Sequence, residues 1–376
     1  MELDVSTILQ LYNTGNAPNS PGTGKSRPDH LAAAEKILED FGFGCLTVPP
    51  LKFPLNPLAK MHNAYRGIDF LRALRVLLFH RRAACVVGHV ESLAVILLLR
   101  RLFWFTPKVV VWEVPWSSGW RFRDAITGIA VPRADLNVVF GSNQVDLIRT
   151  RLSQRAPVAV IPFCVDVGFF SPSSKRAADD GYVFSVGRDC GRDFQIVIDA
   201  MRPLGVPVVL RTSMPVVISQ CNAGRVTVLS KDVSWPDYLE LYERAAVVVI
   251  AASETMNASG VTSLLEAMAM GKAVVVTRTA ALADYLPPPD AGVVVPSGDA
   301  EAMGVAVKAL LADAEGRERM GRRARLFALE HYSPPVHFRA IGKLLSNLLN
   351  GGERAPPHAS SRAESVHSGS YPHAVK

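Results

Sequence analysis

Cationic side chains recur directly after apolar runs in the second half of the chain. Gly187 and Arg188 follow YVFSV, Arg192 comes one turn later, and Lys231 follows RVTVLS. Guanidinium and ammonium groups bind anionic oxygens through charge-assisted hydrogen bonds, so their repetition at equivalent points suits a negatively charged ligand. The spacing therefore indicates an anion site.

A second cluster of polar residues lies in NASGVTSLLEAMAMGKAVVVT, residues 257–277. Asn257, Ser259 and Gly260 offer N-cap chemistry, so the free amides and dipole of the following helix could hold an anion. Ser259, Thr262 and Glu266 share one face, and Glu266 could accept hydroxyl hydrogen bonds from a ribose. An ordinary capped helix with a solvated glutamate fits equally well. The opposite, sheet-facing side carries Val261, Leu264, Leu265 and Met268.

The segment NSPGTGKS, residues 19–26, has the outline of a phosphate-binding loop. The first glycine that a P-loop requires is replaced by Asn19, which disfavours the interpretation as a P-loop nucleoside triphosphatase (NTPase). We interpret it as a loop between a strand and a helix, where Gly22 and Gly24 permit close approach and Lys25 adds charge.

Three further candidates stand just after apolar runs in the first half. His89 follows ACVVG, while Glu113 and Trp116 follow KVVVW. They could line an acceptor site. The alternatives are a structural histidine, a carboxylate that caps a turn and a tryptophan packed under a loop.

Short β-branched runs alternate with helical patterns in both halves, which predicts an α/β protein with two parallel sheets covered on both faces. Ligands of such sheets bind beyond the carboxyl ends of the strands, where the candidate residues stand. The expected organisation is an acceptor domain at 1–165, a linker at 166–181, a donor domain at 182–335, a closing helix at 336–350 and a disordered tail at 351–376.

Composition narrows the class of protein. The 376 residues are 49% hydrophobic, enough for two buried cores. Five scattered cysteines indicate a reducing compartment and predict no metal site. The N-terminus lacks a signal-peptide pattern, so a cytoplasmic location is expected.

The net charge of +7 is concentrated in part in two apolar-basic segments, 65–82 and 92–105. The uncharged run from Ser92 to Leu99 is too short to span a bilayer. The segments fit either core helices with arginines facing water or a surface that lies on a membrane.

The second half resembles a known family. SLLEAMAMGKAVVVT, AGVVVPSGDAEAM and FSVGRDCGRDF are similar to the donor-binding half of the retaining GT-B glycosyltransferases of family 4, and the resemblance covers roughly residues 130–345. It implies two Rossmann-like domains whose parallel sheets face each other across a cleft.

The resemblance also implies roles for residues. Arg188 and Arg192 match the cations on the donor diphosphate, and Glu266 matches the glutamate on the ribose. His89 resembles a histidine of the acceptor side. Lys231 and Val233 match the segment against the base, while the loop that holds phosphates and sugar matches Ser259, Gly260, Val261 and Thr262.

The chain departs from the family at Ala258, where relatives carry a glutamate that contacts the transferred sugar. Glu254 is nearby in sequence and could substitute for it through a shifted loop. We therefore predict a retaining glycosyltransferase that uses a nucleotide-diphospho-sugar as co-substrate, without a further cofactor or nucleic-acid partner. The acceptor would be a saccharide, a lipid or a small molecule. The alternatives are an inactive nucleotide-sugar-binding protein and the P-loop NTPase.

Overall fold

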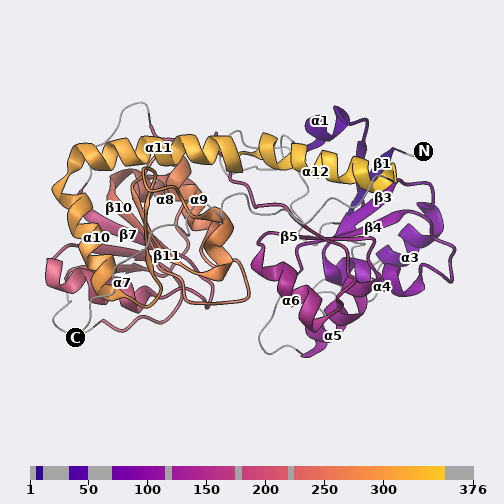
Figure 1. Ribbon diagram of the computed structural model, residues 1–376, viewed down its shortest axis with the longest axis horizontal. Helices are drawn as coiled ribbons and strands as arrows, with labels where there is room; N and C mark the ends of the chain where they lie inside the picture. Colours follow the sequence, from indigo (N-terminus) through magenta and orange to yellow (C-terminus); the bar gives the residue numbers. More distant parts are fainter. Residues whose placement is uncertain are drawn as a thin grey trace, which may run out of the picture.

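A computed structural model describes residues 6–11, 34–49, 70–114, 121–173, 180–218 and 224–351. The short apolar runs of both halves form strands, in two six-stranded sheets whose pairings are all parallel. Helices cover these sheets (Figure 1). The predicted α/β class and GT-B architecture with two Rossmann-like domains are confirmed.

The first sheet has the order β2-β1-β3-β4-β5-β6. Its inner strands β1, β3, β4 and β5 are mostly buried because their residues are almost all apolar, whereas the edge strands β2 and β6 are only partly buried. Helices flank the sheet on both sides. The strands are β1 (Thr7–Leu11), β2 (Gly44–Thr47), β3 (Cys85–Gly88), β4 (Lys108–Trp112), β5 (Leu136–Val139) and β6 (Val158–Val160). The helices are α1 (Ala34–Glu39), α3 (Phe70–Phe79), α4 (Val90–Leu99), α5 (Arg121–Ala130) and α6 (Asn143–Arg151).

The second sheet has the order β12-β11-β10-β7-β8-β9, so the direction of winding reverses between β7 and β10. A reversal of this kind is where open parallel sheets bind ligands. The strands are β7 (Tyr182–Val186), β8 (Val208–Arg211), β9 (Val226–Leu229), β10 (Ala245–Ile250), β11 (Val274–Arg278) and β12 (Val293–Pro296). The helices are α7 (Phe194–Met201), α8 (Trp235–Arg244), α9 (Val261–Ala269), α10 (Ala300–Ala312) and α11 (Ala314–Tyr332), with a 3₁₀ helix, η4 (Ala280–Tyr285).

The last helix, α12 (Pro334–Leu349), joins the two domains. It continues from α11 across to the first domain (Figure 1) and its Phe338, Ile341 and Leu345 enter the core around Ile8. A Cβ atom on Gly342 would lie 2.4 Å from Phe41 Cδ2, so only a glycine permits this approach. The first domain is thus closed by residues from the C-terminal end of the described chain.

The carboxyl ends of β5 and β11 meet at the domain junction. The Ser142 backbone amide donates to Asp284 Oδ2 at 2.6 Å, and the Phe163 amide donates to the Tyr285 hydroxyl at 2.8 Å. The Tyr285 hydroxyl in turn donates to the Phe140 carbonyl. These contacts hold η4 against the start of α6.

Candidate functional site

The loop after β7 is fastened to the end of β10 at the point where the second sheet reverses. The Asp193 amide donates to the Ala251 carbonyl at 3.1 Å, and the Ser253 amide donates to the Gly191 carbonyl at 2.9 Å. Arg192 and Ala252 form an isolated antiparallel bridge. The loop therefore holds Arg192 at the switch point.

The Arg192 side chain is buried there without a hydrogen-bond partner. The residue is only 5% exposed, and all three guanidinium nitrogens lack a hydrogen-bonding group. Burial lowers the pKa of Arg192, because a charged group loses its hydration. A guanidinium in this state is destabilising for the free protein and is a strong binding group for an anion.

The N-terminus of α9 lies against this guanidinium. Its N-cap, Gly260, has φ +85°, and no side chain caps the helix. A Cβ atom at Gly260 would lie 2.8 Å from Arg192 Nη1, and one at Gly187 would lie 2.8 Å from Arg192 Cγ. The two predicted glycines thus make room for the arginine, and the helix amides add to its positive potential.

Ser259 and Asp189 tie the two loops of this site together. Ser259 Oγ donates to Asp189 Oδ1, which also accepts from the Gly191 amide at 3.1 Å. A Cβ atom at Gly191 would lie 2.7 Å from Ser259 Oγ. The structure therefore places Ser259, a predicted ligand contact, in a hydrogen bond within the protein.

Glu266 lies partly buried on α9 beneath two tyrosines of α8. Tyr238 and Tyr242 donate to the same carboxylate oxygen, Oε2, at 2.7 and 2.8 Å. Burial raises the pKa of Glu266 to about 7, although the two hydroxyls and nearby Arg211 and Arg192 lower it. One oxygen is thus already used, and Oε1 is the oxygen left to bind a ligand.

The predicted face of α9 is brought together only in part. Val261 is buried in the core, Ser263 donates to the Val186 carbonyl at 3.2 Å, and Thr262 is exposed. The tyrosine pair was not expected from the sequence. Its signal was present, because Tyr238 and Tyr242 are four residues apart and so share one side of a helix.

The end of β8 and the segment after β9 supply further charge. Arg188 Nη2 contacts Asp232 Oδ1, which also accepts from Arg211 Nη2 at 3.2 Å. Lys231 is exposed, and Val233 packs against the core of the domain. The predicted cationic edge therefore exists, with Asp232 as its counter-charge.

On the side of the first domain, His89 and Glu113 approach each other. His89 is the residue before α4 and its side chain makes no capping hydrogen bond to that helix; its Nδ1 lies 3.9 Å from Glu113 Oε2. Glu113 has φ +60°, a left-handed conformation that is uncommon for a residue with a side chain. Gly22, Gly24 and Trp116 lie outside the described residues.

Glu254, a conceivable replacement for the glutamate missing at Ala258, has another contact. Its carboxylate accepts from the Ala280 amide at 3.1 and 3.3 Å, at the start of η4. Ala258 packs against the core of the domain. Glu254 therefore contributes to the structure of the junction.

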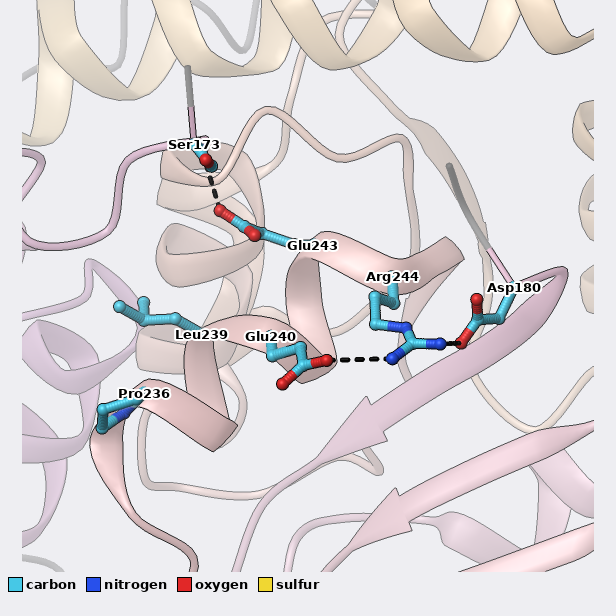
Figure 2. A pocket seen from close by; sticks show the side chains of 7 residues that line it. All are labelled: Ser173, Asp180, Pro236, Leu239, Glu240, Glu243 and Arg244. Atoms are coloured by element: carbon cyan, nitrogen blue, oxygen red, sulfur yellow. Dashed lines mark hydrogen bonds and ion pairs between the residues drawn. The ribbon is translucent and has the colours of Figure 1, made fainter. Parts of the chain in front are cut away.

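A depression of about 500 Å³ lies elsewhere in the second domain, as Figure 2 shows. Its charged groups pair with each other: Arg244 contacts Asp180 at 2.6 Å and Glu240 at 2.9 Å, and Glu243 accepts from the Ser173 amide at 2.8 Å. Asp180 precedes β7, and Arg244 precedes β10. The depression is thus at the amino edge of the sheet, away from the edge where such sheets bind ligands.

Two classes of feature are absent from the described part of the chain. None of its helices is both long and apolar enough to cross a membrane. Nor does it contain a group of three or more His, Cys, Asp or Glu side chains placed to hold a metal ion.

Comparison with known proteins places these observations in a family context. Residues 216–327 match the family model described as glycosyl transferases group 1. No protein with a curated description matches the chain.

Solved structures with the same fold cover nearly the whole chain. Sucrose-phosphate synthase from Thermosynechococcus elongatus is 16% identical, with a TM-score of 0.70 over 92% of this chain and 100% of that one. Anabaena HepE in complex with UDP-glucose is 14% identical, with a TM-score of 0.63 over 91% and 99%. An Escherichia coli structure described as trehalose-6-phosphate bound with UDP-2-fluoro glucose is 13% identical, with a TM-score of 0.60 over 92% of this chain and 99% of that one.

Proposed function

We propose that this glycosyltransferase, whose residues 216–327 match the model of the glycosyl transferases group 1, takes a nucleotide-diphospho-sugar as its donor. The observation that carries the proposal is Arg192, a buried guanidinium with unpartnered nitrogens beside the uncapped N-terminus of α9. A diphosphate would supply the missing negative charge and accept from both groups. The UDP and UDP-sugar complexes of similar folds agree with this assignment.

The chemistry follows from where charge develops. When the bond between the sugar C1 and the diphosphate oxygen breaks, negative charge grows on the leaving diphosphate. Arg192 and the α9 amides are held in place before the reaction, so they stabilise this charge without reorganisation. Arg188 would add a second cation from the edge of the site. Removing one such group costs roughly 3 to 4 kcal/mol of barrier in comparable sites.

Glu266 would bind the ribose of the donor. Oε2 accepts from two tyrosines, which fixes the carboxylate and directs Oε1 toward a ribose hydroxyl. Lys231 and Val233 would lie along the base. Val261 and Thr262 would complete the wall of the phosphate and sugar subsites.

The acceptor would enter from the first domain, where His89 and Glu113 stand at strand ends. We propose a saccharide, lipid or small-molecule hydroxyl as acceptor, transfer with retained anomeric configuration, and a cytoplasmic protein that works in part at a membrane surface. Strain at Glu113, which costs on the order of 1 kcal/mol or more, supports a functional role for that residue.

The rival function is binding of a nucleotide-sugar without transfer. Two observations favour it: Ala258 replaces the glutamate that relatives carry, and the carboxylate of Glu254 accepts a hydrogen bond from the Ala280 amide at the start of η4. The experiment is a panel of UDP-, GDP- and ADP-sugars tested by thermal shift and by release of the nucleoside diphosphate. A glycosyltransferase should show both for one donor. A shift without diphosphate release, in the presence of varied acceptors, would favour the rival.

A further inference from the structure

A group of large apolar side chains stands in water on the first domain. Phe79 is 75% exposed, Leu102 70% and Trp104 81%. Exposed apolar residues of this size are ordinary when scattered, but a contiguous set marks a binding surface. Three arginines close to them in sequence, Arg81, Arg82 and Arg101, are also exposed.

These residues lie at one edge of the first sheet. Phe79 ends α3, and the next residues lead into β3; Leu102 and Trp104 follow α4 and lead into β4. Because β3 and β4 are paired with Cys85 opposite Lys108, the segments before them begin side by side. The Thr106 hydroxyl donates to the Arg81 carbonyl at 3.5 Å, which joins the two segments directly. We call Phe79, Arg81, Arg82, Arg101, Leu102 and Trp104 the basic-apolar patch.

The turn that carries Trp104 is unfavourable for a tryptophan. The Phe105 amide donates to the Arg100 carbonyl at 2.8 Å, and the Trp104 amide donates to the Arg101 carbonyl at 3.3 Å. This pair of bonds is the Schellman motif, in which Trp104 takes the left-handed position that glycine prefers. Trp104 has φ +46°. Neither the turn nor core packing explains a large aromatic residue there, so its exposed ring must be useful for another reason.

The net charge around these side chains is positive. Between Phe70 and Trp112 the sequence contains seven Lys and Arg residues but only one acid, Glu91, which is 5% exposed. Asp135, from outside this segment, pairs with Arg100 and Lys108 at 2.8 and 3.9 Å. The surface that Phe79, Leu102 and Trp104 share is therefore cationic, which matches an anionic partner.

We propose that the basic-apolar patch docks this protein onto an anionic phospholipid membrane, with Trp104, Leu102 and Phe79 in the interface. Tryptophan with flanking arginines suits this location, since the ring sits at headgroup level and the guanidinium groups meet lipid phosphates. The patch is at the amino ends of β3 and β4, whereas the candidate donor site is at the carboxyl edge of the other sheet. Docking therefore leaves the donor site open.

The first test is sedimentation of the full chain with vesicles of phosphatidylcholine and phosphatidylglycerol. The wild-type protein should bind at low salt and dissociate as salt rises, because the arginine term is screened. Arg101→Ala should weaken binding about fivefold, the factor typical of one basic residue near an anionic surface. Val305→Ser, which changes an exposed apolar residue of α10, is the matched control and should bind as the wild type.

The decisive variant is Trp104→Gly. Glycine suits the left-handed turn, so the melting temperature should stay the same or rise, while vesicle binding should fall at least about tenfold. Loss of binding with loss of folding would point to a structural residue and overturn the proposal. So would wild-type binding by Trp104→Gly, or failure of the wild-type protein to bind anionic vesicles at low salt. Nucleotide-sugar binding by each variant should also be measured without vesicles. This measurement tests the proposed function independently of the membrane proposal.

Discussion

Replacing Glu266 by glutamine should make donor binding independent of pH around neutrality. Burial raises the pKa of Glu266 to about 7. A ribose hydroxyl that donates to Oε1 favours the ionised carboxylate, so the donor should bind the deprotonated protein better. Below pH 7 the wild-type affinity should fall by roughly tenfold per pH unit, the limit in which only the ionised form binds. In Glu266→Gln this slope should vanish.

The stability of the donor-free protein should depend on pH in the opposite sense to its donor affinity: the affinity falls as the pH is lowered, whereas the free energy of unfolding falls as the pH is raised. The pKa of Glu266 is above its ordinary value of 4.5, so folding favours the protonated form. Its contribution to stability is therefore complete below pH 4.5 and is lost as the pH rises through 7. At pH 8, Glu266→Gln should raise the free energy of unfolding by up to about 3 kcal/mol, since one pKa unit is about 1.4 kcal/mol.

Calorimetric titration between pH 5.5 and 8.5 is the assay, with the nucleotide-sugar that binds best in the panel. The diphosphate of a nucleotide-sugar is esterified to the nucleoside at one end and to the sugar at the other, so it does not titrate in this range. The slope of affinity against pH therefore reports a titrating group of the protein. Tyr238→Phe removes a hydrogen bond that lowers the pKa of Glu266, and should move the onset of the affinity loss to higher pH. Glu240→Gln, on the exposed side of α8, is the control and should change neither the pH slope of donor affinity nor the pH at which the affinity loss begins. An unchanged slope in Glu266→Gln would refute the reasoning.

Two further predictions concern the edges of the site. Arg188→Ala should weaken donor binding by about 1.5 to 3 kcal/mol in calorimetry with an unchanged melting temperature, because its contact with exposed Asp232 contributes little to folding; equal affinity would remove Arg188 from the site. Glu113→Gly should relieve the left-handed backbone and raise the free energy of unfolding by about 1 kcal/mol in chemical denaturation, while slowing sugar transfer; full activity would mean that the carboxylate does not serve the acceptor side.

The fold could be predicted because its signals are local. Runs such as AAVVVI and YVFSV are almost entirely apolar and rich in valine, and strands buried on both faces need that composition. Gly187 and Gly260 could be singled out for the same reason, because one follows a strand and the other begins a helix, and both positions constrain the backbone locally. Position after a strand was enough to locate Arg188 and Arg192 at one edge.

The contacts of the site depend on residues far apart in the chain, so the sequence could not predict them. Nothing local shows that Arg192 is buried without a partner, or that Glu266 shares one oxygen between two tyrosines of α8. Glu254 illustrates the converse. Its proximity to Ala258 in sequence suggested a catalytic replacement, yet the folded chain places its carboxylate on the Ala280 amide.

The most direct test of the donor site is the variant Arg192→Met. Methionine fills similar space without a charge, and replacing a buried charged group by an apolar one is often neutral or stabilising. The melting temperature of the donor-free variant should therefore equal or exceed that of the wild type, while the increase that the nucleotide-sugar causes in the wild type should disappear. A variant that still binds the donor with wild-type affinity, or one that unfolds because Arg192 supports the structure, would contradict the account.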